Sequence, residues 1–174
     1  MRATSLTVAA LSAALLLTAC SSGGDKDSKQ DRKAAASCVD ELAVEFGPAN
    51  AAPAAGDTGN VPVTVTNRGG AECALDGLPA VELDAGAAST AVAPDQAAPS
   101  GKTKLAKGAS TSFTLTYVRG EEGGGKSLVA QKAKVTLPGS TKGHSFKWSY
   151  GAVALKSDSK TPDASVSGFQ QSGA

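Results

Sequence analysis

This chain of 174 residues has few aromatic side chains, a single histidine and a single methionine. Aromatic residues make up only 4% of it, so its core must be built mainly from Ala, Val and Leu, whose small side chains each contribute modestly when buried. His144 and Met1 cannot supply the clusters of nitrogen or sulfur ligands that copper and zinc sites need. We expect no metal and no other cofactor.

The chain also lacks a surplus of charge of either sign. Only Arg2 of the 17 Lys and Arg residues precedes Cys20, which leaves 16 of them against 16 Asp and Glu residues in the rest of the chain. Proteins that bind nucleic acid or an anionic lipid surface carry an excess of Lys and Arg on one face. The balance therefore argues against a nucleic-acid partner and against electrostatic binding to lipid headgroups.

No apolar run is long enough to cross a membrane. The longest, about 12 residues from Leu6 to Leu17, falls short of the roughly 20 that a spanning helix needs. With Arg2 before it and Leu17-Thr18-Ala19-Cys20 at its end, the segment resembles a bacterial lipoprotein signal, which signal peptidase II cuts before a diacylated cysteine. A membrane-spanning helix and an ordinary secretory signal that leaves Cys20 as a thiol are the alternatives.

We therefore predict that residues 1–19 are a signal peptide and that Cys20 carries acyl chains such as palmitate. Two acyl chains on one residue anchor a protein stably, which predicts attachment to the outer leaflet, at the extracytoplasmic face of the bacterial cell membrane. Residues 20–37 have mixed charges and no large apolar side chain, so they are expected to form a flexible tether. Residues 156–174 are similar in composition and are predicted to be a disordered tail in which only Phe169 could dock. One domain would then span residues 38–155.

Three cysteines, one of them acylated, leave Cys38 and Cys73 as a pair in an exported protein. We predict a disulfide between them, which would close a loop of about 35 residues and stabilise the domain by roughly 3 to 4 kcal/mol. A redox-active or metal-binding pair is the alternative. The chain has no C-x-x-C motif and no histidine near either cysteine, which argues against it.

Apolar residues alternate with polar ones along most of the domain, as in half-buried β-strands. Val61, Val63 and Val65 are the clearest case. Pro62 lacks an N–H donor, so we expect that strand to lie at a sheet edge or to begin at Pro62. The other expected strands carry these apolar residues: Leu42, Val44 and Phe46; Val81 and Leu83; Phe113, Leu115 and Tyr117; Ala133, Val135 and Leu137; Phe146, Trp148 and Tyr150; Val153 and Leu155.

Six or seven short strands, separated by turns rich in Gly, Pro and Asn, predict an all-β fold, an antiparallel β-sandwich of about seven strands. The stretch from Ser127 to Lys132 fits either a helical turn or a strand. The Ala-rich stretches 49–55 and 85–98 are interrupted by Pro and Gly and are predicted to be loops.

Part of the domain is similar to a known family. Residues 63–69 (Val-Thr-Val-Thr-Asn-Arg-Gly) and 73–79 (Cys-Ala-Leu-Asp-Gly-Leu-Pro) follow its pattern of a strand ending in Asn-x-Gly, a Cys, a Leu and a Gly-x-Pro turn. Residues 105–108 resemble its Leu-Ala-Pro-Gly turn, with Lys107 in place of Pro. The chain thus resembles actinobacterial exported lipoproteins that carry an immunoglobulin-like domain of unknown function. The resemblance implies an immunoglobulin-like sandwich, export and the Cys38–Cys73 bridge, and it implies no activity.

The segment from Gly120 to Ser127 satisfies the P-loop expression G-x-x-x-x-G-K-[ST]. A P-loop needs a helix directly after it whose N-terminus faces the phosphates, and few helix-forming residues follow Ser127 before Pro138. Glu121 and Glu122 would also bring negative charge toward a polyphosphate. We interpret the segment as a flexible hairpin tip and predict no nucleotide partner.

Catalytic groups are equally sparse, and we predict that the protein is not an enzyme. His144 lies in a predicted turn, and no G-x-S-x-G motif is present to supply a nucleophile. Lys102, Lys104 and Lys107 are interpreted as part of a solvated loop rather than as an anion site.

Trp148 has two interpretations. It either fills the core, as a tryptophan does in antibody domains, or forms with Phe146 and Tyr150 an exposed aromatic contact surface. The prediction for function is a membrane-anchored, non-catalytic binding or interaction module at the cell envelope, with an envelope protein or a glycan as partner. The alternative is an envelope enzyme or a small-ligand-binding protein whose site the sequence does not reveal.

Overall fold

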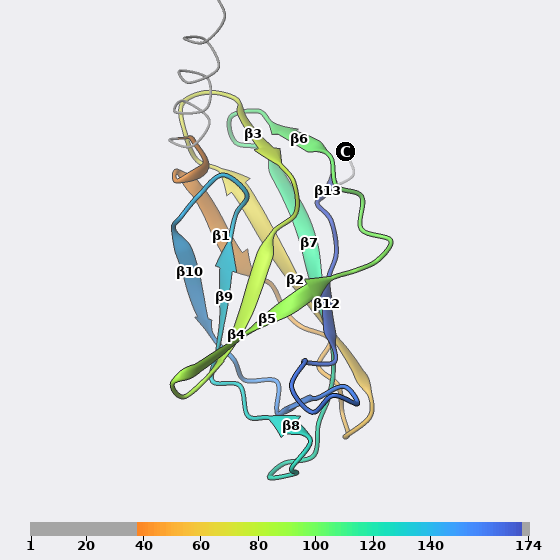
Figure 1. Ribbon diagram of the computed structural model, residues 1–174. Helices are drawn as coiled ribbons and strands as arrows, with labels where there is room; N and C mark the ends of the chain where they lie inside the picture. The colour runs from red at the N-terminus through yellow and green to blue at the C-terminus, as the bar shows by residue number, and fades with distance from the viewer. Residues whose placement is uncertain (1–37, 172–174) are drawn as a thin grey trace, which may run out of the picture.

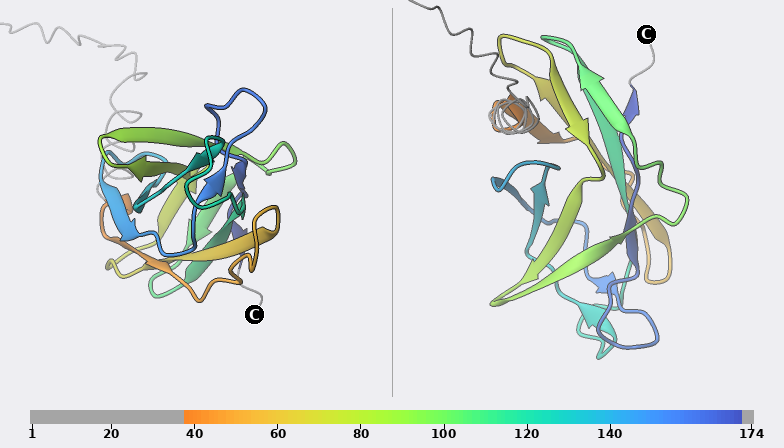
Figure 2. Two further views of the ribbon diagram at one scale, coloured as in Figure 1. Left: turned by 90° about the horizontal axis from the view of Figure 1, so that it is seen from below. Right: turned by 45° about the horizontal axis from the view of Figure 1, so that its top comes forward.

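The computed structural model describes residues 38–171, and every element named in that range is a β-strand. The predicted signal peptide, the lipidation site Cys20 and the tether lie outside the described residues. Eight strands form one path in the order β1-β2-β7-β12-β5-β4-β9-β10, and a ninth strand, β13, pairs with β7. This sheet folds over into two layers around a common core (Figures 1 and 2). The all-β sandwich predicted from the sequence is therefore confirmed.

The first layer is antiparallel and contains the two longest strands, which pair along their length from Thr58 opposite Val118 to Thr66 opposite Ser110. Buried and partly exposed residues alternate strictly along both strands, so one face of the layer covers the core and the other faces solvent. Its strands are β1 (Leu42–Phe46), β2 (Thr58–Asn67), β7 (Ser110–Val118), β12 (Ala164–Val166) and β13 (Gln170–Gln171).

The second layer consists of β4 (Ala80–Ala85), β5 (Ala88–Pro94), β9 (Lys132–Thr136) and β10 (Gly143–Lys147). Strand β5 joins the layers, because it pairs antiparallel with β4 and, at its end, parallel with β12. The sandwich is thus not purely antiparallel. Two small sheets complete the fold: β3 (Cys73–Asp76) with β6 (Lys102–Leu105), and β8 (Ser127–Leu128) with β11 (Val153–Ala154).

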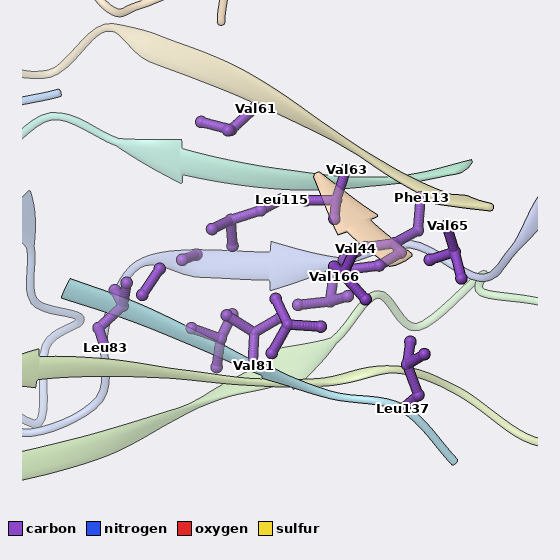
Figure 3. Close-up of a cluster of buried hydrophobic side chains, with 14 of the residues drawn as sticks. Val44, Val61, Val63, Val65, Val81, Leu83, Phe113, Leu115, Leu137 and Val166 are labelled. Atoms are coloured by element: carbon purple, nitrogen blue, oxygen red, sulfur yellow. The ribbon is translucent and has the colours of Figure 1, made fainter. Parts of the chain in front are cut away.

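The core lies between the two layers and is built from the apolar residues at alternate positions of the strands (Figure 3). Val61, Val63 and Val65 of β2 are fully buried, as are the inward residues of β7. Val81 and Leu83 of β4 approach them from the second layer. Most of these side chains are aliphatic and small, so the stability of the core depends on many modest contributions.

Pro62 neither lies in an edge strand nor begins a strand, so that prediction is wrong. Strand β2 starts at Thr58 and lies between β1 and β7. The carbonyl of Pro62 accepts a hydrogen bond from the Gly47 N–H (2.8 Å). In an antiparallel pair the N–H and the carbonyl of one residue point to the same neighbouring strand, so an N–H at position 62 would also point toward β1. That neighbour, β1, ends at Phe46. The sheet tolerates proline here because β7 lies on its other side and, on the side that the Pro62 nitrogen faces, β1 has already ended.

The Ala-rich stretch 85–98, predicted to be a loop, contains β5. This strand carries a weak hydrophobic signal because only Val92 of its seven residues is buried. Its pairing with β4 on one side and β12 on the other outweighs the low strand propensity of alanine.

The described part of the predicted disordered tail is ordered within the sandwich. Strand β12 lies between β7 and β5, and Val166 is 1% exposed. Phe169 packs edge-on against Phe113, with ring centroids 5.8 Å apart. The segment is held by strand pairing on both sides, which supplies partners for backbone groups that would otherwise be unpaired. The domain therefore extends to Gln171 and does not end at residue 155.

Candidate functional site

The predicted disulfide between Cys38 and Cys73 is present at one end of the sandwich. The two sulfur atoms are 2.05 Å apart and the two Cα atoms 5.7 Å apart. Cys38 is the first described residue, whereas Cys73 is 1% exposed and begins β3. The bridge therefore fastens the start of the domain to the small β3–β6 sheet. We call this region, with Cys38, Cys73, Asn67 and strands β3 and β6, the Cys38 end.

Asn67, the first residue of the Asn-x-Gly pattern, holds the Cys38 end together. Its side chain is buried, and its amide nitrogen donates to the carbonyls of Ala71 (2.8 Å) and Leu105 (2.9 Å). Its amide oxygen accepts from the Gly69 N–H (2.9 Å). A Cβ atom at Gly69 would lie 2.6 Å from a carboxylate oxygen at the movable end of the exposed Glu41 side chain and 3.2 Å from the Asn67 amide oxygen, so the space at Gly69 is tight. The residues that carry the family resemblance here have structural roles.

Phe146, Trp148 and Tyr150 do not form one exposed contact surface, so that interpretation is wrong. Strand β10 ends at Lys147, so Trp148 and Tyr150 lie beyond it, although more buried and exposed residues still alternate as far as Tyr150. Trp148 is 5% exposed and its indole N–H donates to the Gly151 carbonyl (2.7 Å), which confirms the core interpretation. Phe146 instead stacks on Phe46 of β1, with ring centroids 4.2 Å apart.

Tyr117 connects the aromatic group to the loops beyond β7. Its ring contacts those of Trp148 and Tyr150, with centroids 5.1 Å and 6.4 Å away. Its hydroxyl donates to the Tyr150 carbonyl (3.1 Å) and accepts from the Ala52 N–H (3.2 Å). Gly59 lies opposite Tyr117, and a Cβ atom there would come within 2.4 Å of the ring. These contacts form a rigid base for the loops.

The end of the domain opposite Cys38 is built from loops and contains a hollow of about 520 Å³. Three segments line it: the end of β7 with the glycine-rich loop that follows, the turn at Ala55 and Gly56, and Ala154 with Leu155. In Figure 1 strand β8 and the glycine-rich loop lie at the bottom, whereas the coloured chain begins at the top beside β3. We call this region, with the 120–127 loop, β8 and β11, the loop end.

Glycines make the space in the hollow. Gly56, Gly120, Gly124 and Gly125 all line it, and a Cβ atom at Gly125 would meet nothing within 4 Å. By contrast, a Cβ atom at Gly120 would lie 2.5 Å from the Ser127 hydroxyl oxygen, because the loop folds back closely onto the end of β7. At these glycines the walls present backbone, which allows the close approach of a ligand or a partner chain.

Arg119 fixes the loops around the hollow rather than offering a free charge. Its guanidinium donates to the carbonyls of Ala52 (2.9 Å) and Pro53 (3.2 Å), and it lies 3.9 Å from the Glu122 carboxylate. The Arg119 carbonyl accepts from the Gly56 N–H (2.8 Å). The more exposed charges on the walls are Glu121 and Lys126, which have opposite sign.

The segment that satisfies the P-loop expression forms this loop, and it lacks the geometry of a P-loop. Ser127 begins the two-residue strand β8, so no helix N-terminus follows the glycines. Glu121 stands on the wall where a polyphosphate would have to lie. The loop contributes a surface of glycines and mixed charge instead.

A second hollow, of about 460 Å³, lies where β5, β7 and β12 meet. Its walls include Asp95, Lys156 and Asp163, so it is polar and again carries both signs of charge. The Asp95 side chain accepts from the Ala97 N–H (2.9 Å), which fixes the turn after β5. Its charged groups are therefore partly engaged in local structure.

Ser140, Asp40 and His144 come together near the Cys38 end without forming a catalytic triad. The Ser140 hydroxyl donates to the Asp40 carboxylate (2.6 Å), and the His144 imidazole makes no hydrogen bond with another described residue. Burial lowers the pKa of His144, Lys142 lowers it further, and Asp40 opposes them. In a triad the hydroxyl would bond to the imidazole, so this arrangement does not activate the serine.

Between residues 38 and 171, no group of three or more His, Cys, Asp and Glu side chains is placed to hold a metal ion. The same part of the chain has no helix with the length and apolar character needed to cross a membrane. We therefore take the hollow at the loop end as the candidate site. The one sequence signal for it is the run of glycines from Gly123 to Gly125, which by itself predicts only a hairpin tip.

Comparison with known families finds a match to the model described as "Domain of unknown function (DUF4232)", over residues 38–170. Neither the curated proteins nor the solved structures contain a match. The matched span begins at Cys38 and reaches β13, so it coincides with the domain seen in the structure.

Proposed function

We propose that this chain, which belongs to the DUF4232 family of domains of unknown function, is a lipid-anchored, non-catalytic binding module of the cell envelope. The observation that carries the proposal is the glycine-lined hollow at the loop end, opposite Cys38. A tether that joins the domain at Cys38 would leave the loop end facing away from the membrane. An envelope protein would meet that end first.

Two features support the location. Leu17-Thr18-Ala19-Cys20 resembles the lipoprotein processing site, and the resemblance of residues 63–79 to actinobacterial exported lipoproteins agrees with it. The Cys38–Cys73 disulfide is also typical of proteins that leave the reducing cytosol. Together they favour an anchored protein at the extracytoplasmic face of the membrane.

Acylation is tested by labelling cells with a palmitate analogue. We expect the label on the wild-type protein and on Cys38→Ala, and none on Cys20→Ala, because only Cys20 follows the processing site. Label that persists on Cys20→Ala would refute the anchor.

Partner binding at the loop end is tested by photo-crosslinking in intact cells. A photoreactive residue in place of Lys126, which is exposed and lines the hollow, should give a discrete crosslinked product. Adding Gly125→Leu should abolish it, because the new side chain fills the hollow. Gly70→Leu is the matched control, since Gly70 also has open space around its Cβ position but lies after β2, near the Cys38 end. A product that survives Gly125→Leu would contradict the assignment.

A small-ligand-binding protein is a second candidate, and the size of the hollow favours it. About 520 Å³ falls within the range of roughly 300 to 1,000 Å³ that small-molecule sites occupy. Native mass spectrometry of the purified protein would then detect a bound molecule that is lost in Gly125→Leu and kept in Gly70→Leu.

A further inference from the structure

The outer face of the first layer carries a grid of hydroxyl side chains. The residues of β2 and β7 that point away from the core include Thr64, Thr66, Ser110, Ser112, Thr114 and Thr116, which we call the hydroxyl face. The strand register places Thr66 opposite Ser110 and Thr64 opposite Ser112. Neighbouring strands are about 4.8 Å apart and alternate residues about 6.8 Å apart along a strand, so the hydroxyls repeat in two directions.

Strands β2 and β7 contribute no charged residue to this face, although the fold does not require that. On the outer face of the second layer, Lys134 lies opposite Glu82 and Lys132 opposite Asp84. Charged residues flank the face on both sides. Glu45 of β1 lies opposite Thr64 and is paired with Arg68 at 2.6 Å. At the other side, Asp95, Lys156 and Asp163 line the second hollow together with Thr116 and Ser165. Surfaces of small domains usually mix both signs of charge, so the neutrality of the hydroxyl face calls for an explanation.

Three of the hydroxyls are held by neighbouring side chains. The Thr66 and Ser110 hydroxyl oxygens are 2.8 Å apart, and the Thr116 hydroxyl donates to the side-chain oxygen of Asn60 (2.9 Å). A hydroxyl can donate once and accept twice, so each keeps capacity for an external partner. Ser165 of β12 extends the grid beside Thr116. The face can therefore act as donor or acceptor at many points.

We propose that the hydroxyl face binds an uncharged polysaccharide laid across β2 and β7. A charged ligand laid along β2 and β7 would find no counter-charge on these two strands, and an apolar one would leave the hydroxyls without partners. An uncharged polyhydroxyl chain matches both properties. Each exchange of a hydrogen bond with water for one with a sugar gains little, so binding must come from many repeated contacts along a polymer. This surface is separate from the hollow, and the proposal does not rest on the loop end.

The test is affinity electrophoresis of the full-length protein in detergent, through gels that contain dextran, mannan or arabinogalactan. At least one of these uncharged polymers should retard the protein, and the retardation should persist at high salt, which screens only charge interactions. Dextran sulfate is the charged comparison and should retard it less than dextran.

Two double variants with the same added charge locate the surface. Thr64→Lys with Thr114→Lys should weaken the retardation by about tenfold, because repeated contacts along the face are interrupted. Ser89→Lys with Ala91→Lys places the new lysines opposite Asp84 and Glu82 on the other layer and should leave it unchanged. If melting shows the first variant to be unfolded, Thr64→Val with Thr114→Val removes the hydroxyls while keeping the branched shape.

Four outcomes would overturn the proposal: no retardation by any uncharged polymer, retardation that salt abolishes, equal weakening in both lysine variants, or loss with Gly125→Leu, which would place the polysaccharide in the hollow. Sedimentation gives a fifth. If the wild-type protein self-associates and Thr64→Lys with Thr114→Lys does not, the face binds a second copy of the chain instead.

Discussion

The Cys38 end and the loop end of the same domain differ in what their residues do. At the Cys38 end, Asn67 bonds to backbone groups from two other segments and Cys73 is buried in a disulfide. At the loop end, Gly125 has open space around it and Lys126 is exposed. The recognisable sequence pattern therefore marks the end that stabilises the fold. The end proposed for binding carries only the glycine run, whose match to the P-loop expression the geometry does not support.

Loss of the disulfide should have the largest effect on stability. Replacing both cysteines, Cys38→Ser with Cys73→Ser, frees a loop with a sequence separation of 35 residues. The unfolding free energy should fall by about 3 to 4 kcal/mol, because the unfolded chain regains loop entropy. Urea denaturation measures this. A fall below about 1 kcal/mol would show that the Cys38 end is not the stabilising one.

Asn67→Ala should cause the second-largest loss of unfolding free energy. It leaves the buried carbonyl of Leu105 and the N–H of Gly69 without their partner, and we expect a loss of about 2 to 4 kcal/mol. Arg68→Ala is the matched control next to it, since its ion pair with Glu45 is exposed and should be worth under about 1 kcal/mol. Equal losses in the two variants would contradict the role of Asn67.

Gly125→Leu should sharpen the comparison by separating binding from stability. Its Cβ position is open and its backbone is in an ordinary conformation, so denaturation should change by no more than about 0.5 kcal/mol. Crosslinking from Lys126 should nevertheless disappear. A large loss of stability would mean that the glycine-rich loop is part of the folding core.

The smallest effect concerns Asp158 in the loop before β12. Hydrogen bonds from the Thr161 side chain and from the backbone N–H groups of Thr161 and Lys160 lower its pKa from 3.8 to about 2. The folded loop is therefore favoured above the ordinary pKa, and this contribution is lost as pH falls through about 2. NMR titration should show the pKa rise toward 3.8 in Thr161→Val. The aspartate is fully exposed, so global stability should hardly change.

Much of the fold could be predicted from the sequence wherever alternation was strong. Strand β7 could be predicted because its inward residues, Phe113, Leu115 and Tyr117, are large apolar side chains at every second position. Strands β5 and β12 escaped prediction for the opposite reason. Val92 is the one buried residue of β5, and β12 has three residues, so both depend on strand pairing that only the tertiary fold supplies.

The candidate site was less accessible to prediction. The Cys38–Cys73 bridge followed from counting cysteines, and Trp148 was correctly placed in the core as one of two interpretations. The hollow, however, exists because several of its wall residues are glycines, and its walls come from segments as distant in the sequence as Gly56 and Leu155. A glycine in a sequence shows that space exists around one residue, and it does not show which other segments border that space.

The position of β12 has a consequence for how the molecule is made. Among the strands of the sheet path it comes last in the chain, yet it lies between β7 and β5 and supplies the hydrogen bonds that join the two layers. The two layers therefore cannot be joined by strand pairing until residues 164–166 are in place. The domain is expected to gain its stability in one late step of folding rather than gradually as successive strands pair.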